Sequence, residues 1–118
     1  MDLNEMIKSL KAHPEQRRIG MIASHVGIVR GTSRDGRDVT GIEVAYDHDK
    51  IKRIIDDVKA KQGIVEVLVD ANEGGLKVGD DILTVAVAGE IRDDVFPALI
   101  EAVNRIKIEA TRKKEFFD

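Results

Sequence analysis

The stretch Ile82-Leu83-Thr84-Val85-Ala86-Val87-Ala88 is apolar at every position except Thr84. A strand with one face in solvent alternates apolar and polar side chains, whereas a strand covered on both faces is apolar almost throughout. Residues 82–88 therefore predict a central strand with other elements packed on both of its faces. The segments before and after it must supply that cover.

Helical patterns lie on both sides of this strand. Apolar residues recur every three or four positions near the N-terminus, after Asp47 and after Asp93 or Asp94. The first helix is expected to end near His13-Pro14, because the residue before a proline avoids helical geometry. Asp47 is a suitable N-cap for the second helix, and Gly63 is expected to end it.

Strand-like segments separate these helices. The predicted strands and β-rich segments are 18–30, 39–46, 64–69 and 82–88. The resulting order, α-β-β-α-β-β-α, predicts an α+β domain with helices packed on a mostly antiparallel sheet. No internal repeat or linker divides residues 1–118, so a single domain is expected.

Glycines and polar residues mark the predicted bends. Gly20 and Gly27 interrupt segment 18–30 and indicate bends or close backbone approach. Residues 32–38 form a predicted polar turn that carries Arg34 and Arg37, and residues 72–75 form a second turn. Pro97 is tolerable if it falls in the first turn of the last helix.

The composition excludes several classes of function. Charged residues make up 35% of the chain, yet the net charge is −3 and aromatic residues are only 3%, which argues against a general nucleic-acid binder. There is no cysteine, hence no disulfide, zinc thiolate or cysteine nucleophile. The sequence has no apolar run long enough to span a membrane and no signal-peptide pattern at its start, so a cytoplasmic location is expected by default.

The three histidines, His13, His25 and His48, lack the paired spacing that a metal site requires, and no metal or cofactor is expected. His25, in a strand-like segment, is most simply a hydrogen-bonded histidine of the core or rim. His48 belongs to Asp47-His48-Asp49, which fits capping of the second helix better than metal binding.

Lys107 is the most informative single residue. The last helix has an apolar stripe formed by Phe96, Leu99, Ile100, Val103 and Ile106. At about 100° per residue, Lys107 projects between Ile100 and Val103, and Lys114 follows at nearly the same angle if the helix continues. An ammonium group in an apolar stripe must reach out to solvent, find a counter-ion, or line a pocket that receives an anion.

Two further cations lie at predicted element ends: Arg30 follows a strand and Arg92 precedes the last helix. Strand ends and helix starts can meet at one rim of such a domain, where Arg30, Arg92, Lys107 and Lys114 would form an anion pocket. A desolvated lysine there is able to act as base or nucleophile. The alternative is that each cation is an ordinary solvated side chain.

The order of several motifs resembles the large, catalytic subunit of molybdopterin synthase, the MoaE family, over nearly the whole chain. The motifs are Gly27-Ile28-Val29-Arg30, Leu76-Lys77-Val78-Gly79-Asp80-Asp81-Ile82, Ile91-Arg92 with Phe96, and Lys107 with Lys114 at the family spacing. The resemblance implies an α/β hammerhead-type fold and a homodimer of large subunits that completes a heterotetramer with small subunits.

The resemblance also implies a reaction and roles for individual residues. A small ubiquitin-like partner ending in Gly-Gly, activated as a thiocarboxylate, would supply sulfur to cyclic pyranopterin monophosphate and form molybdopterin. Lys107 would be the catalytic acid/base or transient acyl acceptor, with Lys114 beside it holding substrate or the partner's C-terminus. Arg30 and Arg92 would bind the phosphate or pterin, and Arg34 and Arg37 would contribute from their loop.

The sequence departs from the family pattern near the implied site. Ile91 stands where the family has a histidine, and Ala71-Asn72-Glu73-Gly74 replaces a His-Arg-x-Gly turn. Thr111-Arg112-Lys113 replaces a Pro-aromatic-Trp segment, so the last helix is expected to run on toward Lys114. The alternative function is a non-catalytic dimeric protein, for binding or regulation, that keeps only an anion pocket.

Overall fold

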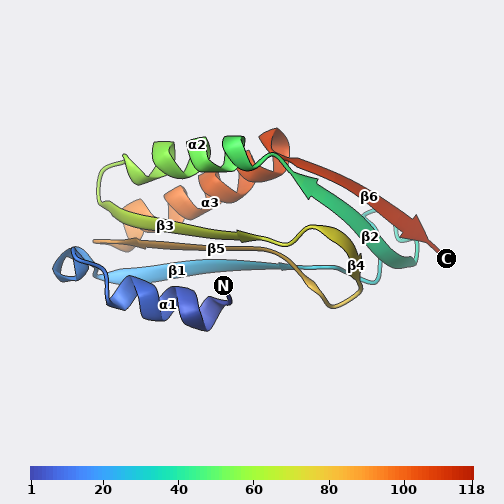
Figure 1. Cartoon of the computed structure of the whole chain (residues 1–118), viewed down its shortest axis with the longest axis horizontal. Helices are drawn as coiled ribbons and strands as arrows, with labels where there is room; N and C mark the ends of the chain where they lie inside the picture. The colour runs from blue at the N-terminus through green and yellow to red at the C-terminus, as the bar shows by residue number, and fades with distance from the viewer.

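The computed structural model describes all 118 residues and contains two small antiparallel sheets with three α-helices (Figure 1). The elements are α1 (Leu3–Lys11), the 3₁₀ turn η1 (Gln16–Arg18), β1 (Met21–Ile28), β2 (Val39–Tyr46), α2 (His48–Lys59), β3 (Ile64–Ala71), β4 (Gly74–Lys77), β5 (Asp81–Gly89), α3 (Arg92–Glu109) and β6 (Thr111–Phe117). One sheet has the order β1-β5-β3 and the other β4-β2-β6. The α+β class predicted from the sequence is confirmed.

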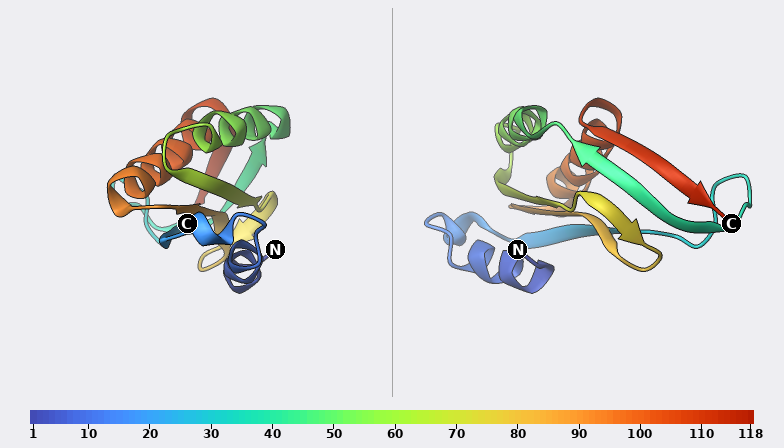
Figure 2. Two further views of the ribbon diagram at one scale, coloured as in Figure 1. Left: turned by 90° about the vertical axis from the view of Figure 1, so that its left-hand side faces the viewer. Right: turned by 45° about the vertical axis from the view of Figure 1, so that its right-hand side comes forward.

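Strand β5 is the centre of the first sheet, as its apolar sequence predicts. It pairs with β1 on one side and β3 on the other, both antiparallel. Leu83, Val85 and Val87 face the main core under α2 and α3, whereas Ala86 and Ala88 lie in the cluster under α1. Figure 2 shows α1 on one side of this sheet and the other two helices on the opposite side.

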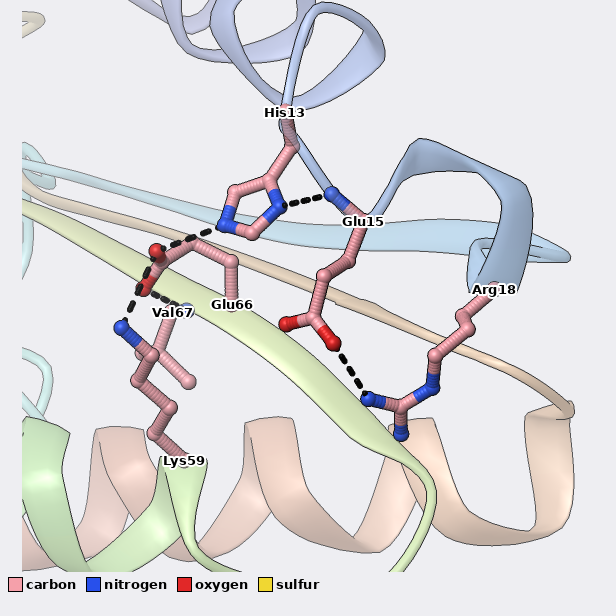
Figure 3. Close-up of polar contacts among 6 residues, drawn as sticks. All are labelled: His13, Glu15, Arg18, Lys59, Glu66 and Val67. Carbon is pink, nitrogen blue, oxygen red and sulfur yellow. Dashed lines mark hydrogen bonds and ion pairs between the residues drawn. The ribbon is translucent and has the colours of Figure 1, made fainter.

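Polar contacts at the start of η1 hold the N-terminal segment against β3 (Figure 3). His13 Nδ1 accepts a hydrogen bond of 2.9 Å from the Glu15 N–H, so its ring proton lies on Nε2 and points to Glu66 Oε2 at 3.2 Å. Lys59 Nζ donates to the same Glu66 oxygen at 3.2 Å, and the Val67 N–H donates to the other. Glu66 therefore joins the N-terminal segment, α2 and β3.

The second sheet has its own small core. Val29, Val39, Ile42, Val44 and Leu76 form this cluster. Tyr46 and Ile82 pack against both this cluster and the main core. The Tyr46 hydroxyl donates to the Ile82 carbonyl at 3.1 Å, which satisfies its polar end at the joint between the two sheets.

The last helix ends earlier than the sequence pattern predicts. Helix α3 stops at Glu109, and Thr111–Phe117 forms β6, which pairs with β2. At the end of the helix, the Thr111 hydroxyl donates to the Ile106 carbonyl at 2.7 Å, and the Asp47 N–H donates to the Ala110 carbonyl at 2.8 Å. These bonds satisfy carbonyls that a continued helix would use, so the expected extension through Lys114 is wrong.

Turns and boundaries differ from the prediction in three respects, whereas one predicted close approach of the backbone is confirmed. The turn expected at 72–75 is shorter, because β4 begins at Gly74, and β4 and η1 were not expected. Helix α3 begins at Arg92, so Pro97 lies in its second turn and not in the first. Gly20 matches its prediction, because an added Cβ would collide with the Glu90 carbonyl oxygen.

Candidate functional site

The buried face of α3 differs from the predicted stripe. The buried residues are Val95, Ala98, Leu99, Ala102, Val103 and Ile106. Phe96 and Ile100 are 49% and 60% exposed, and Lys107 is exposed in the last turn. Since the helix turns about 100° per residue, Phe96, Ile100 and Lys107 form one line along the outside of the helix. Lys107 therefore borders an exposed apolar strip and does not project into the core.

Lys107 lies near His25 of β1. His25 is on the same face of β1 as Ala23, which packs in the core under α3. Burial is the main factor that lowers the pKa of His25 below its ordinary value of 6.5, and the positive charge of Lys107 lowers it further. The charge of Lys107 is thus close enough to β1 to act on the His25 imidazole.

The Nε2 atom of His25 has neither solvent contact nor a hydrogen-bond partner. It lies 3.1 Å from the position that a Cβ on Gly27 would occupy, so the glycine provides the space for the ring. The sequence interpretation of His25 as a hydrogen-bonded histidine is wrong, because a period-two pattern shows which residues share a face but not which polar atoms meet.

Lys114 lies on β6 and not on the helix that carries Lys107. It pairs in register with Glu43 of β2, and its Nζ is 5.5 Å from the centre of the Phe116 ring. The predicted shared helical azimuth of the two lysines therefore does not exist. Their relative position is set by the reversal of the chain at Ala110.

The loop after β1 contacts the end of β6. Thr32 and Asp38 form an isolated bridge, and the guanidinium carbon of Arg37 lies 3.6 Å from the centre of the Phe117 ring. The Asp118 N–H donates to the Asp38 carbonyl at 3.2 Å. Arg37 and Lys114 are thus brought to neighbouring aromatic rings of one strand, while Arg30 and Arg34 remain exposed nearby in sequence.

Arg92 cannot join Lys107 within one chain. It is the first residue of α3 and Lys107 is in the last turn, fifteen residues later. At 1.5 Å per residue, their backbones are about 22 Å apart along the axis. Arg92 instead lines a surface cavity of about 480 Å³ that also includes Glu90, Ile91, Asp93 and Phe96. The expectation that the four cations share one rim is therefore wrong for a single chain.

None of the six predicted site cations is neutralised by a carboxylate. Arg30, Arg34, Arg37, Arg92, Lys107 and Lys114 take part in no ion pair, whereas Arg18, Lys59, Lys61 and Arg105 do. Nine other basic side chains are also unpaired, so this property permits anion binding without locating it. No cluster of three or more potential ligands is placed to hold a metal ion, and no helix is long and apolar enough to cross a membrane.

The two sheets, the helices on both faces of β5 and the exposed cations at the ends of α3 define an α+β protein with a candidate oxyanion site. The sequence model of the family described as MoaE protein matches residues 1–109. The chain belongs to the MoaE family. Lys107 lies inside the matched residues, and Lys114 lies beyond them.

Individual relatives agree with this assignment. The chain is 31% identical over 94 residues to an uncharacterised protein of Methanocaldococcus jannaschii, covering 76% of this chain and 79% of that protein. It is 31% identical over 113 residues to the molybdopterin synthase catalytic subunit of Ralstonia nicotianae, covering 92% of this chain but 62% of that protein. The chain therefore spans about three fifths of the length of the Ralstonia relative.

Solved structures show the same fold. The molybdopterin biosynthesis MoaE protein of Burkholderia ambifaria superposes with a TM-score of 0.80 at 27% identity, covering 98% of this chain and 76% of that one. A complex of subunits 1 and 2 of the molybdopterin-converting factor from Helicobacter pylori contains a chain with a TM-score of 0.73 at 16% identity, covering 99% of this chain and 80% of that one.

Proposed function

We propose that this chain acts in molybdenum cofactor biosynthesis as the large subunit of a molybdopterin synthase. It would transfer sulfur from the C-terminal thiocarboxylate of a small subunit to cyclic pyranopterin monophosphate. The observation that carries this proposal is membership of the MoaE family across residues 1–109, a range that includes Lys107. The expected cytoplasmic location remains a prediction.

The composition of the site suits this chemistry. The chain has no cysteine, so the sulfur must come from another molecule, and a thiocarboxylate-bearing partner provides it. Both the thiocarboxylate and the phosphate of the substrate are anions, and Lys107 and Lys114 are exposed cations without carboxylate partners. Lys107 is assigned the role of acid/base or transient acyl acceptor. As a base or acyl acceptor it must first lose its proton, whereas as an acid it donates the proton that it carries.

The position of Arg92 favours a homodimer as the working unit. Since Arg92 and Lys107 lie at opposite ends of α3, a second copy whose α3 runs antiparallel would bring its Arg92 to the lysine's site. Phe96 and Ile100 are exposed along the face between these two ends and would be covered in such a pairing. Arg30 and Arg92 are assigned to the phosphate or pterin, with Arg34 and Arg37 contributing from the loop that contacts β6.

The small subunit is the second proposed partner. The Helicobacter pylori structure holds two subunits of a molybdopterin-converting factor, and its chain of this fold covers nearly all of the present one. We assign to this chain a partner of the same type, a small ubiquitin-like protein ending in Gly-Gly. Its extended tail would bring the thiocarboxylate to Lys107.

The proposal is tested by reconstitution. The chain is mixed with a thiocarboxylated small subunit and cyclic pyranopterin monophosphate, and dithiolene formation is measured. Wild-type protein should form product, and Lys107→Ala should lose at least about 100-fold in rate, the size typical of a missing acid–base group. Lys52→Ala, which removes an exposed lysine of α2, should retain wild-type activity.

Two outcomes would contradict the assignment. Product formation by Lys107→Ala at the wild-type rate would remove Lys107 from the mechanism. Retention of the pterin phosphate by wild-type protein without any sulfur transfer, with several competent small subunits, would instead support the non-catalytic binding role.

A further inference from the structure

His25 is the one buried polar side chain whose nitrogen has no partner in this structure. Its Nε2 is sealed from solvent beside Gly27, and no donor or acceptor reaches it. Leaving a buried polar atom unpaired costs about 1–3 kcal/mol, and native proteins keep few such atoms. An apolar side chain would avoid this cost at a position on the core-facing side of β1. The imidazole at this position therefore requires an explanation.

The second imidazole nitrogen is accessible. No hydrogen bond occupies Nδ1, and this atom is not among the buried unpartnered atoms. Nδ1 therefore retains contact with solvent and is free to accept a proton or to bind a ligand. His25 thus combines a sealed nitrogen in the protein with an open nitrogen at its surface.

The charged surroundings of His25 are simple. From α3, Lys107 is the charged group that acts on the ring. From β5, the register partner of His25 is Val85, and its neighbours Leu83 and Val87 are also apolar. Helix α1 packs against the opposite face of the sheet, over Ala86 and Ala88, so its charges do not face the ring. No carboxylate is paired with Lys107 or with His25.

This arrangement resists a positive charge on His25 until an anion arrives. In the free protein, burial and the neighbouring ammonium group both disfavour the imidazolium ion, so the ring is neutral at neutral pH. An oxyanion bound to Lys107 would offset the repulsion and favour protonation of the ring. By linkage, the protonated ring must then strengthen binding of the anion by the same factor.

We propose that His25 is the second cation of the Lys107 site and takes up a proton when an oxyanion binds there. This proposal rests on the proposed function and adds a residue that the family motifs in the sequence do not include. The ligand chemistry is a phosphate or a carboxylate-type group, the two anions that sulfur transfer would bring to this site. His25 is assigned as a positioning residue, because its charge would hold the anion beside Lys107.

The test is an NMR titration of the three histidines, His13, His25 and His48, between pH 4 and 8. Wild-type protein is titrated alone, with inorganic phosphate, and separately with a synthetic peptide ending in Gly-Gly. Chloride is added to keep the ionic strength equal in all three titrations. Whichever anion occupies the site should raise the midpoint of His25 by at least half a unit, which corresponds to about threefold tighter binding to the protonated form. His48, exposed and paired with Glu73, should shift no more with either anion than with chloride.

Variants separate the role of Lys107 from general effects of charge. Lys107→Met keeps the length of the side chain but removes its charge, so it should raise the midpoint of His25 in the free protein and abolish the response to the anion. Lys52→Met, on the exposed side of α2, should change neither value. His25→Gln keeps a polar side chain that does not titrate, and it should remove the strengthening of anion binding at low pH.

Each failure has a distinct meaning. If phosphate or the peptide binds saturably beside Lys107 but leaves the midpoint of His25 unchanged, the role of His25 is wrong and the proposed function stands. An unchanged His25 midpoint in free Lys107→Met would also overturn it, because the two groups would not be coupled. If neither anion binds at Lys107, the anion site of the proposed function fails together with this inference.

Discussion

Tyr46 lies at the joint between the two sheets, and its surroundings there change its pKa. Its ring packs against both apolar cores, and its hydroxyl donates to the Ile82 carbonyl. Burial, with a smaller effect from the negative charge of Glu73, raises the pKa of Tyr46 from 10.0 to about 12. The neutral phenol is therefore strongly favoured in the folded protein.

This shift gives a prediction that can be read from absorbance alone. Tyr46 is the only tyrosine and there is no tryptophan, so phenolate absorbance near 295 nm reports this residue without mutagenesis. The midpoint of ionisation should lie near pH 10 in urea but near pH 12 in the folded protein. Because the folded state holds the proton more tightly, stability should decrease as the pH rises from 10 toward 12. A midpoint near 10 in the folded protein would show that burial does not raise the pKa of Tyr46.

Lys107 illustrates what sequence reasoning about a residue can and cannot provide. Its predicted place within a buried apolar stripe is wrong, because the structure puts Lys107 beside the exposed residues Phe96 and Ile100. The sequence does not reveal that Phe96 and Ile100 are exposed, because an apolar side chain looks the same whether it faces the core or an interface. The predicted buried face therefore wrongly included Phe96 and Ile100, which lie on the exposed side of the helix.

Among the elements, β5 was the most predictable and β6 the least. The apolar run at 82–88 is an intrinsic signal, since only burial on both faces explains it. In contrast, Thr111–Phe117 contains adjacent charges and no alternating pattern, and its extended form depends on pairing with β2. Tertiary pairing of this kind is invisible to local pattern. In contrast, the separation of Arg92 and Lys107 follows directly from their spacing of fifteen residues along one predicted helix.

The docking of the N-terminal segment yields a prediction about acid stability. Burial alone would raise the pKa of Glu66, but hydrogen bonds from the Val67 N–H, Lys59 and His13 outweigh it and hold the pKa below the ordinary 4.5. A carboxyl group with a lowered pKa stabilises the fold above pH 4.5, and this contribution is lost as the pH falls below that value.

Glu66→Gln should therefore be less stable than wild type at pH 7, by about 1.5 kcal/mol, the size of a hydrogen bond to a charged group. The difference should shrink as the pH is lowered from 4.5 toward 3. Urea unfolding of both proteins at several pH values measures it. Glu5→Gln, at an exposed residue of α1, should match wild type throughout. A Glu66→Gln deficit that stays constant with pH would show that the carboxylate charge is not the source of the stability.

The whole molecule is elongated, with extents of 50 × 25 × 23 Å and a radius of gyration of 15.2 Å (Figure 2). A compact domain of this length would have a radius of gyration of about 13.5 Å. The excess reflects the second sheet, which extends beyond the helices at one end of the molecule. An elongated chain with exposed apolar residues is well suited to assembly with other subunits.

The dimer leads to a prediction at this scale that does not depend on activity. Wild-type protein should sediment as a dimer, and Ile100→Asp should shift it to the monomer, because a charge would then lie on the strip between Arg92 and Lys107. Ile108→Asp is a matched control on the same helix: Ile108 is 82% exposed and lies about 80° around the axis from Ile100. Dissociation by the Ile108 variant alone would place the interface on another face of α3.

The chain reversal at Ala110 has a consequence for how the spacing between Lys107 and Lys114 can vary. Lys107 is on a helix, where inserting one residue turns a side chain by about 100°, whereas Lys114 is on a strand, where one residue moves it to the opposite face. An insertion or deletion of a single residue between Ala110 and Lys114 would thus remove Lys114 from its present face of the sheet while leaving Lys107 in place. Only an insertion or deletion of two residues would keep both ammonium groups on their present faces, so the face that Lys114 occupies depends on the length of this short segment.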